Sequence, residues 1–511
     1  MVAVVVLVII LVVALLTGVH WYVWRRLVRD TTAPGGTARR VGTAVLWVLP
    51  LLSLGALMSG RVGVPFSVQR VLAWPGFLWL AVLLYLVLAL VAGEAVRPLL
   101  TRLLAGRAPS PAGPLFSPAA SGTASAGTRT DGPAPASGDV AVATGTVVSP
   151  AAGGARAEAG AVAPAGQVSP SGDGAVAIGT VVSPDTGDAT SVGTRTDGLV
   201  PASGDGAVAT GTVVSPDTGD ATSAGAAVSG DAARGALSRR VFVARVVGGA
   251  AATAALGTVG YGTYGVLRGP RVKRVTVPLA KLPRAAHGYR IAVVSDIHLG
   301  PILGRAHTQR IVDTINAAQP DLVAVVGDLV DGSVADLGSA AEPLAGLRSR
   351  DGAFFVTGNH EYFSGADAWV DHVRELGLRP LRNERVEIAG GFDLAGVDDV
   401  AGESEGQGPD FAKALGDRDR SRASVLLAHQ PVVIHDAVEQ GVDLQLSGHT
   451  HGGQLWPGNF LAGLANPTVA GLERYGDTQL YVSRGAGAWG PPVRVGASSD
   501  ITVVELASRQ A

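Results

Sequence analysis

The chain has 511 residues, a net charge of −2 and no cysteine. This length exceeds one ordinary core, so we expect more than one domain or segment. The near-neutral charge gives no general basic signal for nucleic-acid binding, and the lack of cysteine excludes disulfides and thiolate metal sites. It leaves the cellular compartment open, because cysteine-free proteins suit either side of a membrane.

Residues 1–104 predict a membrane region with three transmembrane helices. The expected spans, at about 2–23, 42–60 and 74–95, are apolar and long enough to cross a bilayer. Tryptophan and arginine residues follow the first span, as interfacial and cationic anchors do. A secretory signal peptide is the alternative for this first segment, but its positive flank should precede the apolar core rather than follow it.

Residues 105–237 consist mainly of Ala, Gly, Ser, Thr, Pro, Val and Asp and contain internal copies. The hexapeptide Gly-Thr-Val-Val-Ser-Pro begins at Gly145, Gly179 and Gly211. A repeat of this kind can form a β-solenoid. These copies lack the large apolar residues that would stack into a core, so the entropy of ordering them would be unopposed. We therefore predict a disordered linker.

Residues 238–269 predict a fourth transmembrane helix, which contains an uncharged stretch at 246–267. Its basic start, Ser-Arg-Arg-Val-Phe at 238–242, resembles a twin-arginine export signal, and a plain basic flank is the alternative. Both interpretations place Arg239 and Arg240 in the cytoplasm. Together with the arginine-rich first loop, they predict that the linker lies inside and that everything after Arg268 lies outside the cytoplasm. The basic residues that directly follow this span oppose that topology.

From about residue 270, short apolar runs alternate with helix-like segments. This alternation predicts an α/β layered sandwich in which mostly buried strands are joined through helices. The expected strands are 290–294, 322–326, 353–356, 392–395, 425–428, 444–446, 480–482 and 501–505. The expected helices are 306–318, 335–348, 365–376 and 431–440.

Carboxylate, imidazole and carboxamide side chains follow five of these strands, at the ends where such sheets place their sites. They are Asp296, His298, Asp328, Asp331, Asn359, His360, His429, His449 and His451. Singly, each motif would more often be a turn or a packing residue. Five of the ten histidines fall in this fixed order, however, and the mixed nitrogen and oxygen ligands suit two divalent ions of Mn, Fe or Zn.

The spacing predicts two adjacent metal sites. Strand alternation would aim Asp296 and His298 to one side, and the two oxygens of Asp328 can bridge two ions. His451, two residues after His449, can return to the first ion. Two such ions lower the pKa of a shared water and clamp the oxygens of a phosphoryl group during in-line attack.

His360 is the motif histidine that is not needed as a ligand, so we predict that it protonates the leaving group. Asp331 is predicted to hydrogen-bond an imidazole such as that of His360 and to keep it oriented and cationic. We assign the remaining histidines to surface or core roles; they are His20, His287, His307, His372 and His435.

These motifs resemble the five motifs of the calcineurin-like metallophosphoesterase superfamily over about residues 270–508. Segments 426–431 and 452–455 are similar to a narrower, membrane-attached bacterial branch, described as transmembrane proteins with a metallophosphoesterase domain. The resemblance implies a four-layer α/β/β/α sandwich in which His360 is the proton donor. It assigns Asp296, His298, Asp328 and His451 to one metal, and Asp328, Asn359, His429 and His449 to the other.

The resemblance also implies phosphodiester or pyrophosphate substrates of lipid or envelope metabolism, such as UDP-2,3-diacylglucosamine. The leading hypothesis is therefore a phosphoesterase that is anchored in the cell membrane and acts at its outer face. A second hypothesis is a membrane sensor or scaffold that only binds a phosphorylated ligand, although no ligand position has been lost. A third, a transporter, lacks the mid-span charge that would mark a pathway.

Overall fold

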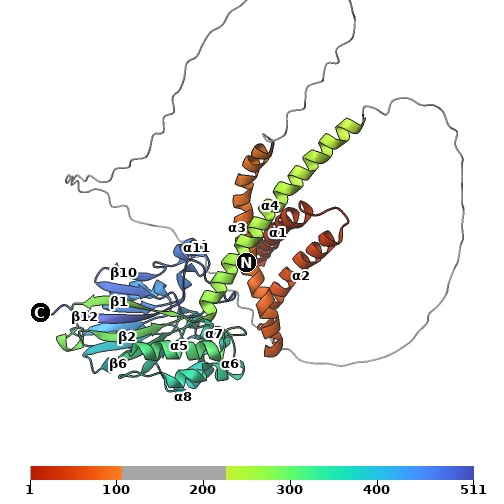
Figure 1. Cartoon of the computed structure of the whole chain (residues 1–511). Helices are drawn as coiled ribbons and strands as arrows, with labels where there is room; N and C mark the ends of the chain where they lie inside the picture. The colour runs from red at the N-terminus through yellow and green to blue at the C-terminus, as the bar shows by residue number, and fades with distance from the viewer. Residues whose placement is uncertain (1, 106–225, 511) are drawn as a thin grey trace, which may run out of the picture. The chain divides into compact units, whose positions relative to one another are not determined.

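The computed structural model describes residues 2–105 and 226–510. The first three helices are α1 (Val2–Trp24), α2 (Thr37–Ser59) and α3 (Phe66–Ala105), and α1 continues into a π-helical turn at Arg25–Arg29 (Figure 1). Helix α4 (Ala226–Leu267) precedes the first strand. Most of the linker predicted at 105–237 lies outside the described residues, and its last part, from Ala226, belongs to α4.

Four helices among the described residues are long and apolar enough to cross a membrane. The qualifying segments, 6–29, 37–59, 66–103 and 239–267, each overlap one of the expected spans. Large apolar side chains are exposed along them; those of Leu15 and Trp47 are both 67% exposed. Because water disfavours such a surface, the helices have the character of lipid-facing spans.

The C-terminal part of the chain contains two six-stranded mixed sheets. The order of the first is β1-β12-β2-β3-β4-β5, with bounds Arg271–Leu279, Asp500–Ser508, Tyr289–Val294, Leu322–Val326, Ala353–Val356 and Arg379–Pro380. The order of the second is β10-β11-β9-β8-β7-β6, with bounds Gly471–Tyr475, Thr478–Val482, Leu444–Ser447, Ala423–Leu427, Phe392–Gly396 and Glu384–Ile388. Strands β2, β3 and β4 run parallel, as do β7, β8 and β9.

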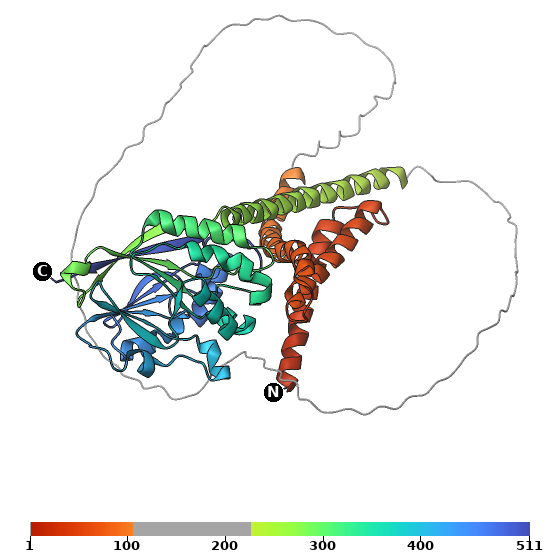
Figure 2. The ribbon, with the colours of Figure 1, turned by 90° about the horizontal axis from the view of Figure 1, so that it is seen from below.

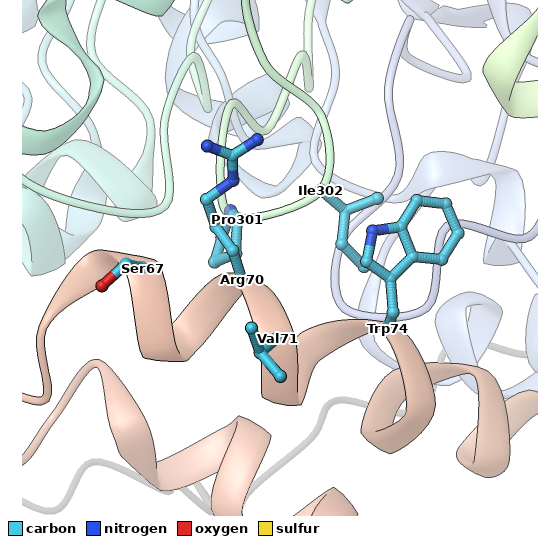
Figure 3. A pocket seen from close by; sticks show the side chains of 6 residues that line it. All are labelled: Ser67, Arg70, Val71, Trp74, Pro301 and Ile302. Carbon is cyan, nitrogen blue, oxygen red and sulfur yellow. The ribbon is translucent and has the colours of Figure 1, made fainter.

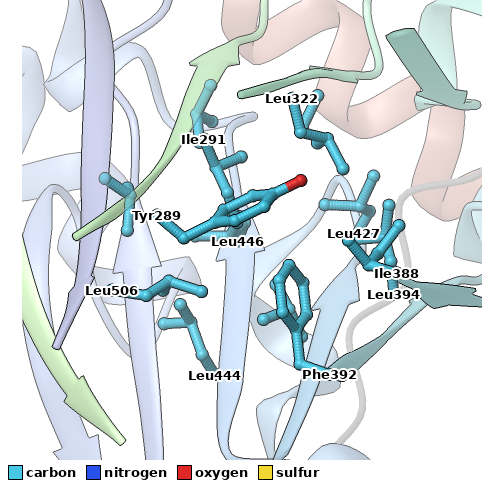
Figure 4. Packing of buried hydrophobic residues seen from close by; sticks show 14 of the residues in the cluster. Tyr289, Ile291, Leu322, Ile388, Phe392, Leu394, Leu427, Leu444, Leu446 and Leu506 are labelled. Atoms are coloured by element: carbon cyan, nitrogen blue, oxygen red, sulfur yellow. The ribbon is translucent and has the colours of Figure 1, made fainter. Parts of the chain in front are cut away.

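The two sheets pack face to face and helices cover their outer faces (Figures 1 and 2). The inner core joins side chains of both sheets, such as Ile291 and Leu322 from the first and Leu427 and Leu446 from the second (Figure 4). Helices α5 (Arg305–Ala318), α6 (Val334–Ala341) and α8 (Ala366–Glu375) bury apolar side chains against the first sheet. Helices α9 (Phe411–Leu415) and α10 (Ile434–Glu439) do so against the second. The predicted four-layer α/β/β/α sandwich is confirmed.

All eight expected strands are present, with ends that differ by three residues at most. The four strands that the sequence did not predict, β1, β5, β6 and β10, are the four edge strands of the two sheets. An edge strand has one neighbour and more exposed side chains: in β1, Val277 and Leu279 alone are fully buried. Its sequence therefore lacks the continuous apolar run by which the central strands are recognised.

A shallow pocket lies outside the predicted site. It is lined by Ser67, Arg70, Val71 and Trp74 of α3 and by Pro301 and Ile302, which follow β2 (Figure 3). None of the predicted metal ligands lines it.

His307 of α5 is buried in the helix layer, and neither of its ring nitrogens has a hydrogen-bond partner among the described residues. Burial, together with the charges of Arg310 and Arg494, lowers the pKa of His307 to about 3. The unfolded chain takes up a proton at this residue below its ordinary pKa and the folded chain does not. Folding is therefore penalised as the pH falls, by up to about 1.4 kcal/mol per pH unit.

When the pH falls from about 7 to about 5, the free energy of unfolding should decrease in the wild type because His307 stays neutral in the folded chain. In His307→Leu we expect this decrease to be smaller by about 2 kcal/mol. The measurement compares thermal unfolding of the full chain in detergent at both pH values. Replacement of the exposed His435 by leucine supplies the control, because it removes a histidine from the surface instead of from the helix layer. An equal loss in the wild type and His307→Leu would contradict the assignment.

Candidate metal centre

The predicted ligands follow the carboxyl ends of parallel strands in both sheets. Asp296 and His298 come after β2, Asp328 and Asp331 after β3, and Asn359 and His360 after β4; His429 follows β8, and His449 and His451 follow β9. Parallel strands end at one edge of each sheet, and the two sheets pack face to face. Residues up to 155 positions apart in sequence therefore meet at one place.

Asp296, His298 and His451 form a first group whose potential ligand atoms lie within 4.8 Å of one another. Nε2 of His451 is 3.3 Å from Oδ1 of Asp296 and 3.0 Å from Nε2 of His298. All three residues are buried. This proximity agrees with the expected first metal site.

Asp328, His429 and His449 form a second group with the same spacing limit. Oδ2 of Asp328 is 3.1 Å from Nε2 of His429 and 3.7 Å from Nε2 of His298, so Asp328 lies between the two groups. Asn359 adjoins the second group, with its Oδ1 atom 3.0 Å from Nδ1 of His449. The structure thus brings the predicted ligands together in two groups, with Asp328 between them.

Comparisons with known proteins identify the family of the chain. Residues 289–453 match the family model described as calcineurin-like phosphoesterase. An uncharacterized metallophosphoesterase of Helicobacter pylori is 40% identical over 256 residues, which are 50% of this chain and 68% of that protein. One from Aquifex aeolicus is 35% identical over 240 residues, 46% of this chain and 91% of that protein. The chain belongs to the calcineurin-like phosphoesterase family.

The name of a further relative mentions both a transmembrane protein and a metallophosphoesterase domain. The transmembrane protein with metallophosphoesterase domain of Danio rerio is 40% identical over 259 residues, 48% of this chain and 59% of that protein. The chain thus spans less than two thirds of the length of this curated relative. The resemblance to transmembrane proteins with a metallophosphoesterase domain is confirmed, and the relative that carries this name comes from an animal.

The backbone at Asp296 and His298 differs from the strand geometry that was expected to aim both side chains to one side. Strand β2 ends at Val294, and both residues have left-handed backbone, with φ of 51° and 49°. Strand alternation therefore does not aim them; a strained loop does. Asp328, His449 and His451 are left-handed too, so five of the eight described non-glycine residues with positive φ are predicted ligands. Such strain is typical of functional sites.

Hydrogen bonds on the far side of two imidazoles fix their orientation. Nδ1 of His298 lies 2.8 Å from Oδ1 of Asp331, and Nδ1 of His429 lies 2.9 Å from the carbonyl oxygen of Val326. Carboxylate and carbonyl oxygens accept, so in both rings Nδ1 is the donor. The Nε2 atoms are left to face the site, as metal-ligating histidines require.

Burial and the charges of neighbouring groups shift the pKa values of the candidate ligands. Burial raises the pKa of Asp296. Burial also disfavours the charged forms of both Asp328 and His429, but the charge of each stabilises that of the other. This pairing raises the pKa of His429 well above its ordinary value and holds the pKa of Asp328 well below its ordinary value. Burial lowers the pKa of His449 to about 4, which leaves a neutral ring of the kind that binds metals.

A metal ion fits these residues. The Nε2 atom of His429 is buried without a hydrogen-bond partner among the described residues, beside a carboxylate. Members of this family normally use a dimetal centre, and the nitrogen and oxygen atoms offered here suit Mn, Fe or Zn.

His360 lies beside the metal site and is paired with Asp331. Its Nδ1 atom is 2.7 Å from Oδ1 of Asp331, the same oxygen that contacts His298. Burial opposes the charged form of the ring, but the hydrogen bond and the charge of Asp331 outweigh it and raise the pKa of His360 to about 9. The predicted contact between Asp331 and His360 is present.

Two residues for which the sequence predicts no role also hold the site together. Arg494, which is 4% exposed, directs Nη1 to the carbonyl oxygen of His451 and Nη2 to its Nδ1 atom, both at 3.1 Å. No local pattern distinguishes this arginine, because its partner lies 43 residues earlier. Glu361 is fully buried and accepts the backbone N–H groups of Asp328, Leu329 and Gly358. Its position three residues after the helix N-cap at Gly358 was a usable signal.

We expect Glu361→Gln to destabilise the domain by about 1–3 kcal/mol, because an amide group cannot accept all three N–H groups. Misplacement of Asp328 should also lower activity about 10-fold to 100-fold, as is common for residues that support metal ligands. Thermal unfolding and turnover of the full chain measure the two effects. Glu375→Gln is the matched control, because the Glu375 side chain is 75% exposed. Unchanged behaviour of Glu361→Gln would refute the positioning role.

Gly358 and Gly448 lie beside two of the candidate carboxylate ligands. Gly358 has φ of −112°, which any residue adopts. A Cβ atom there would overlap the carboxylate of Asp328, and one at Gly448 would overlap that of Asp296. The lack of a side chain admits the ligands at these two positions.

We therefore expect Gly358→Ala to reduce bound metal at least about tenfold by displacing Asp328. Elemental analysis of the purified full chain after dialysis measures this. Gly304→Ala is the control, because Gly304 also has an extended backbone and a Cβ atom there meets nothing within 4 Å. Equal metal content in both variants would show that the site tolerates the added methyl group.

Proposed function

We propose that this chain is a membrane-anchored, dimetal phosphoesterase that hydrolyses phosphodiester or pyrophosphate bonds. One observation carries the proposal: two groups of nitrogen and oxygen ligands meet at Asp328, and the His360–Asp331 pair lies beside them. Membership of the phosphoesterase family supports the reaction class, while the bond that is cleaved is part of the proposal.

In this proposal one metal would be held by Asp296, His298, Asp328 and His451, and the other by Asp328, Asn359, His429 and His449. When bound, two such ions polarise the phosphoryl group and activate a water molecule. The chain's own residues fix the ligand positions: Asp331 and the carbonyl oxygen of Val326 orient the imidazoles, and Glu361 holds the turn that carries Asp328.

His360 would act as the general acid. The charge of Asp331 keeps its ring protonated at neutral pH, and Asp331 binds Nδ1, so Nε2 is the atom that delivers a proton to the departing oxygen. Asp331 would then act as a positioning residue for two rings, because it contacts both His298 and His360.

The proposed organisation has a three-helix membrane region at 1–104, a linker at 105–237, a fourth span at 238–269 and the phosphoesterase domain at 270–511. The four candidate spans and the Danio rerio relative support a multi-pass protein of the cell membrane. The arginines before the fourth span favour a catalytic domain outside the cytoplasm. A lipid or envelope phosphoester, UDP-2,3-diacylglucosamine-like in chemistry, is the proposed substrate class.

We expect the full chain in detergent with Mn²⁺ to hydrolyse bis-p-nitrophenyl phosphate and to lose this activity on chelation. Asp328→Asn and His360→Asn should each lower turnover about 10²-fold to 10⁴-fold. His360→Asn should keep its metal content, whereas Asp328→Asn should lose metal.

Asp371→Asn is the control, since that side chain is 73% exposed. Full activity in both variants would refute the mechanism. Tight binding of phosphoesters without turnover in the wild type would instead identify the sensor or scaffold.

A further inference from the structure

Large apolar side chains are exposed in a collar around the metal centre. In the described part of the phosphoesterase domain, the large apolar side chains that are more than half exposed are Phe363, Trp456, Phe460, Leu461, Leu464 and Trp489. The other exposed ones in this domain reach 40% at most. Soluble surfaces seldom concentrate apolar groups in this way unless they bind something.

Half of the collar belongs to α11 (Gly458–Ala465), and contacts attach this helix to a metal-ligand turn. No residue of α11 is buried, and Phe460, Leu461 and Leu464 are spaced to share one face. A Cβ atom at Gly453, two residues after His451, would overlap Asn459 at the start of the helix. The chain after α11 returns to the same turn, where the hydroxyl of Thr450 donates to the carbonyl oxygen of Val469.

The rest of the collar adjoins the proposed general acid. The rings of Phe363 and Trp489 lie 5.6 Å and 5.8 Å from the ring of His360, centre to centre, and meet it edge to face. Reciprocal hydrogen bonds between Gln454 and the backbone of Trp489 connect this side to the segment that leads into α11. The collar is therefore continuous with the catalytic residues.

The connection to α4 indicates what covers the collar. Its uncharged stretch, 246–267, matches the hydrocarbon thickness of a bilayer, and the exposed Tyr261 and Tyr264 near its end are typical of an interface. Three residues, which reach about 10 Å at most, separate Leu267 from β1. They are followed by cationic side chains, such as Arg271 and Arg274, that suit anionic headgroups.

We propose that the collar inserts into the bilayer interface beside the fourth span, with α11 as an interfacial helix. The site then receives a phosphoester from the headgroup of an amphiphile that stays in the membrane. The substrate class rests on the proposed function, whereas the insertion does not. An apolar helix face flanked by tryptophans is the form that interfacial segments take.

The test uses the absence of cysteine from the chain. Leu464→Cys in the full chain is labelled with pyrene and reconstituted into phosphatidylglycerol-containing liposomes with doxyl-labelled lipid. Insertion predicts at least about twofold quenching of the pyrene monomer by doxyl lipid. Asp417→Cys is the control and should remain unquenched; its side chain is 84% exposed and pairs with Arg385 of β6, at the edge of the second sheet opposite β10. No quenching at 464, or equal quenching at 417, overturns the proposal.

Pyrene excimer emission at position 464 without lipid quenching would also overturn it, in favour of a second copy of this chain.

A separate activity measurement tests the substrate class. The combined substitutions Phe460→Ser, Leu461→Ser and Leu464→Ser should lower hydrolysis of liposome-embedded phosphoesters about tenfold and leave bis-p-nitrophenyl phosphate hydrolysis unchanged. Val432→Ser with Val438→Ser is the control for lost apolar surface. A wild type that is inactive on every ester refutes the proposed function, while the quenching result still decides insertion.

Discussion

The buried carboxylates of Asp296 and Asp328 impose the main constraint on the phosphoesterase domain, because two acidic groups that repel each other are withdrawn from water. Their side chains are almost fully inaccessible, and an unpaired buried charge costs several kcal/mol. Four imidazoles surround them, and the outer nitrogens of His298 and His429 are committed to oxygen acceptors. The inward nitrogens and the carboxylates therefore form a cage that only positive charge can satisfy. The proposed dimetal chemistry rests on this arrangement rather than on any single motif.

The loops that carry the cage residues have a strained backbone. Each left-handed L-residue costs about 1–2 kcal/mol, and five of the predicted ligands adopt that form. The flanking parallel strands are fully buried, as in β3 and β8, so the rigid sandwich holds these strained loops in place. Gly358 and Gly448 contribute by leaving space for the carboxylates, and Glu361 contributes three hydrogen bonds to the backbone around Asp328. The stable core of the sandwich thus holds the candidate ligands in place at the ends of the strands.

The central strands could be predicted from the sequence, and the candidate ligands could be proposed from it, because both leave local signals. Buried parallel strands read as continuous apolar runs, and the ligands follow those runs directly. The edge strands leave no such signal, since β1 and β10 carry charged, exposed side chains. Arg494 acts on His451 across 43 residues, a contact that only the fold creates. The left-handed backbone at Asp296 and His298 could not be predicted from the sequence either. The expected alternation of side chains assumes that the strand continues past Val294, where it ends.

His360 marks the boundary between the charged centre and the apolar collar. One side of its ring contacts Asp331, while Phe363 and Trp489 meet its edges. A general acid faces the leaving group, so the part of the substrate that departs would lie toward the collar and the part that keeps the phosphate would lie toward the metals. If the collar is in the bilayer interface, the departing group is the membrane-embedded half of the amphiphile. The polar product is then released on the water side, and the fourth span keeps the domain next to its remaining substrate.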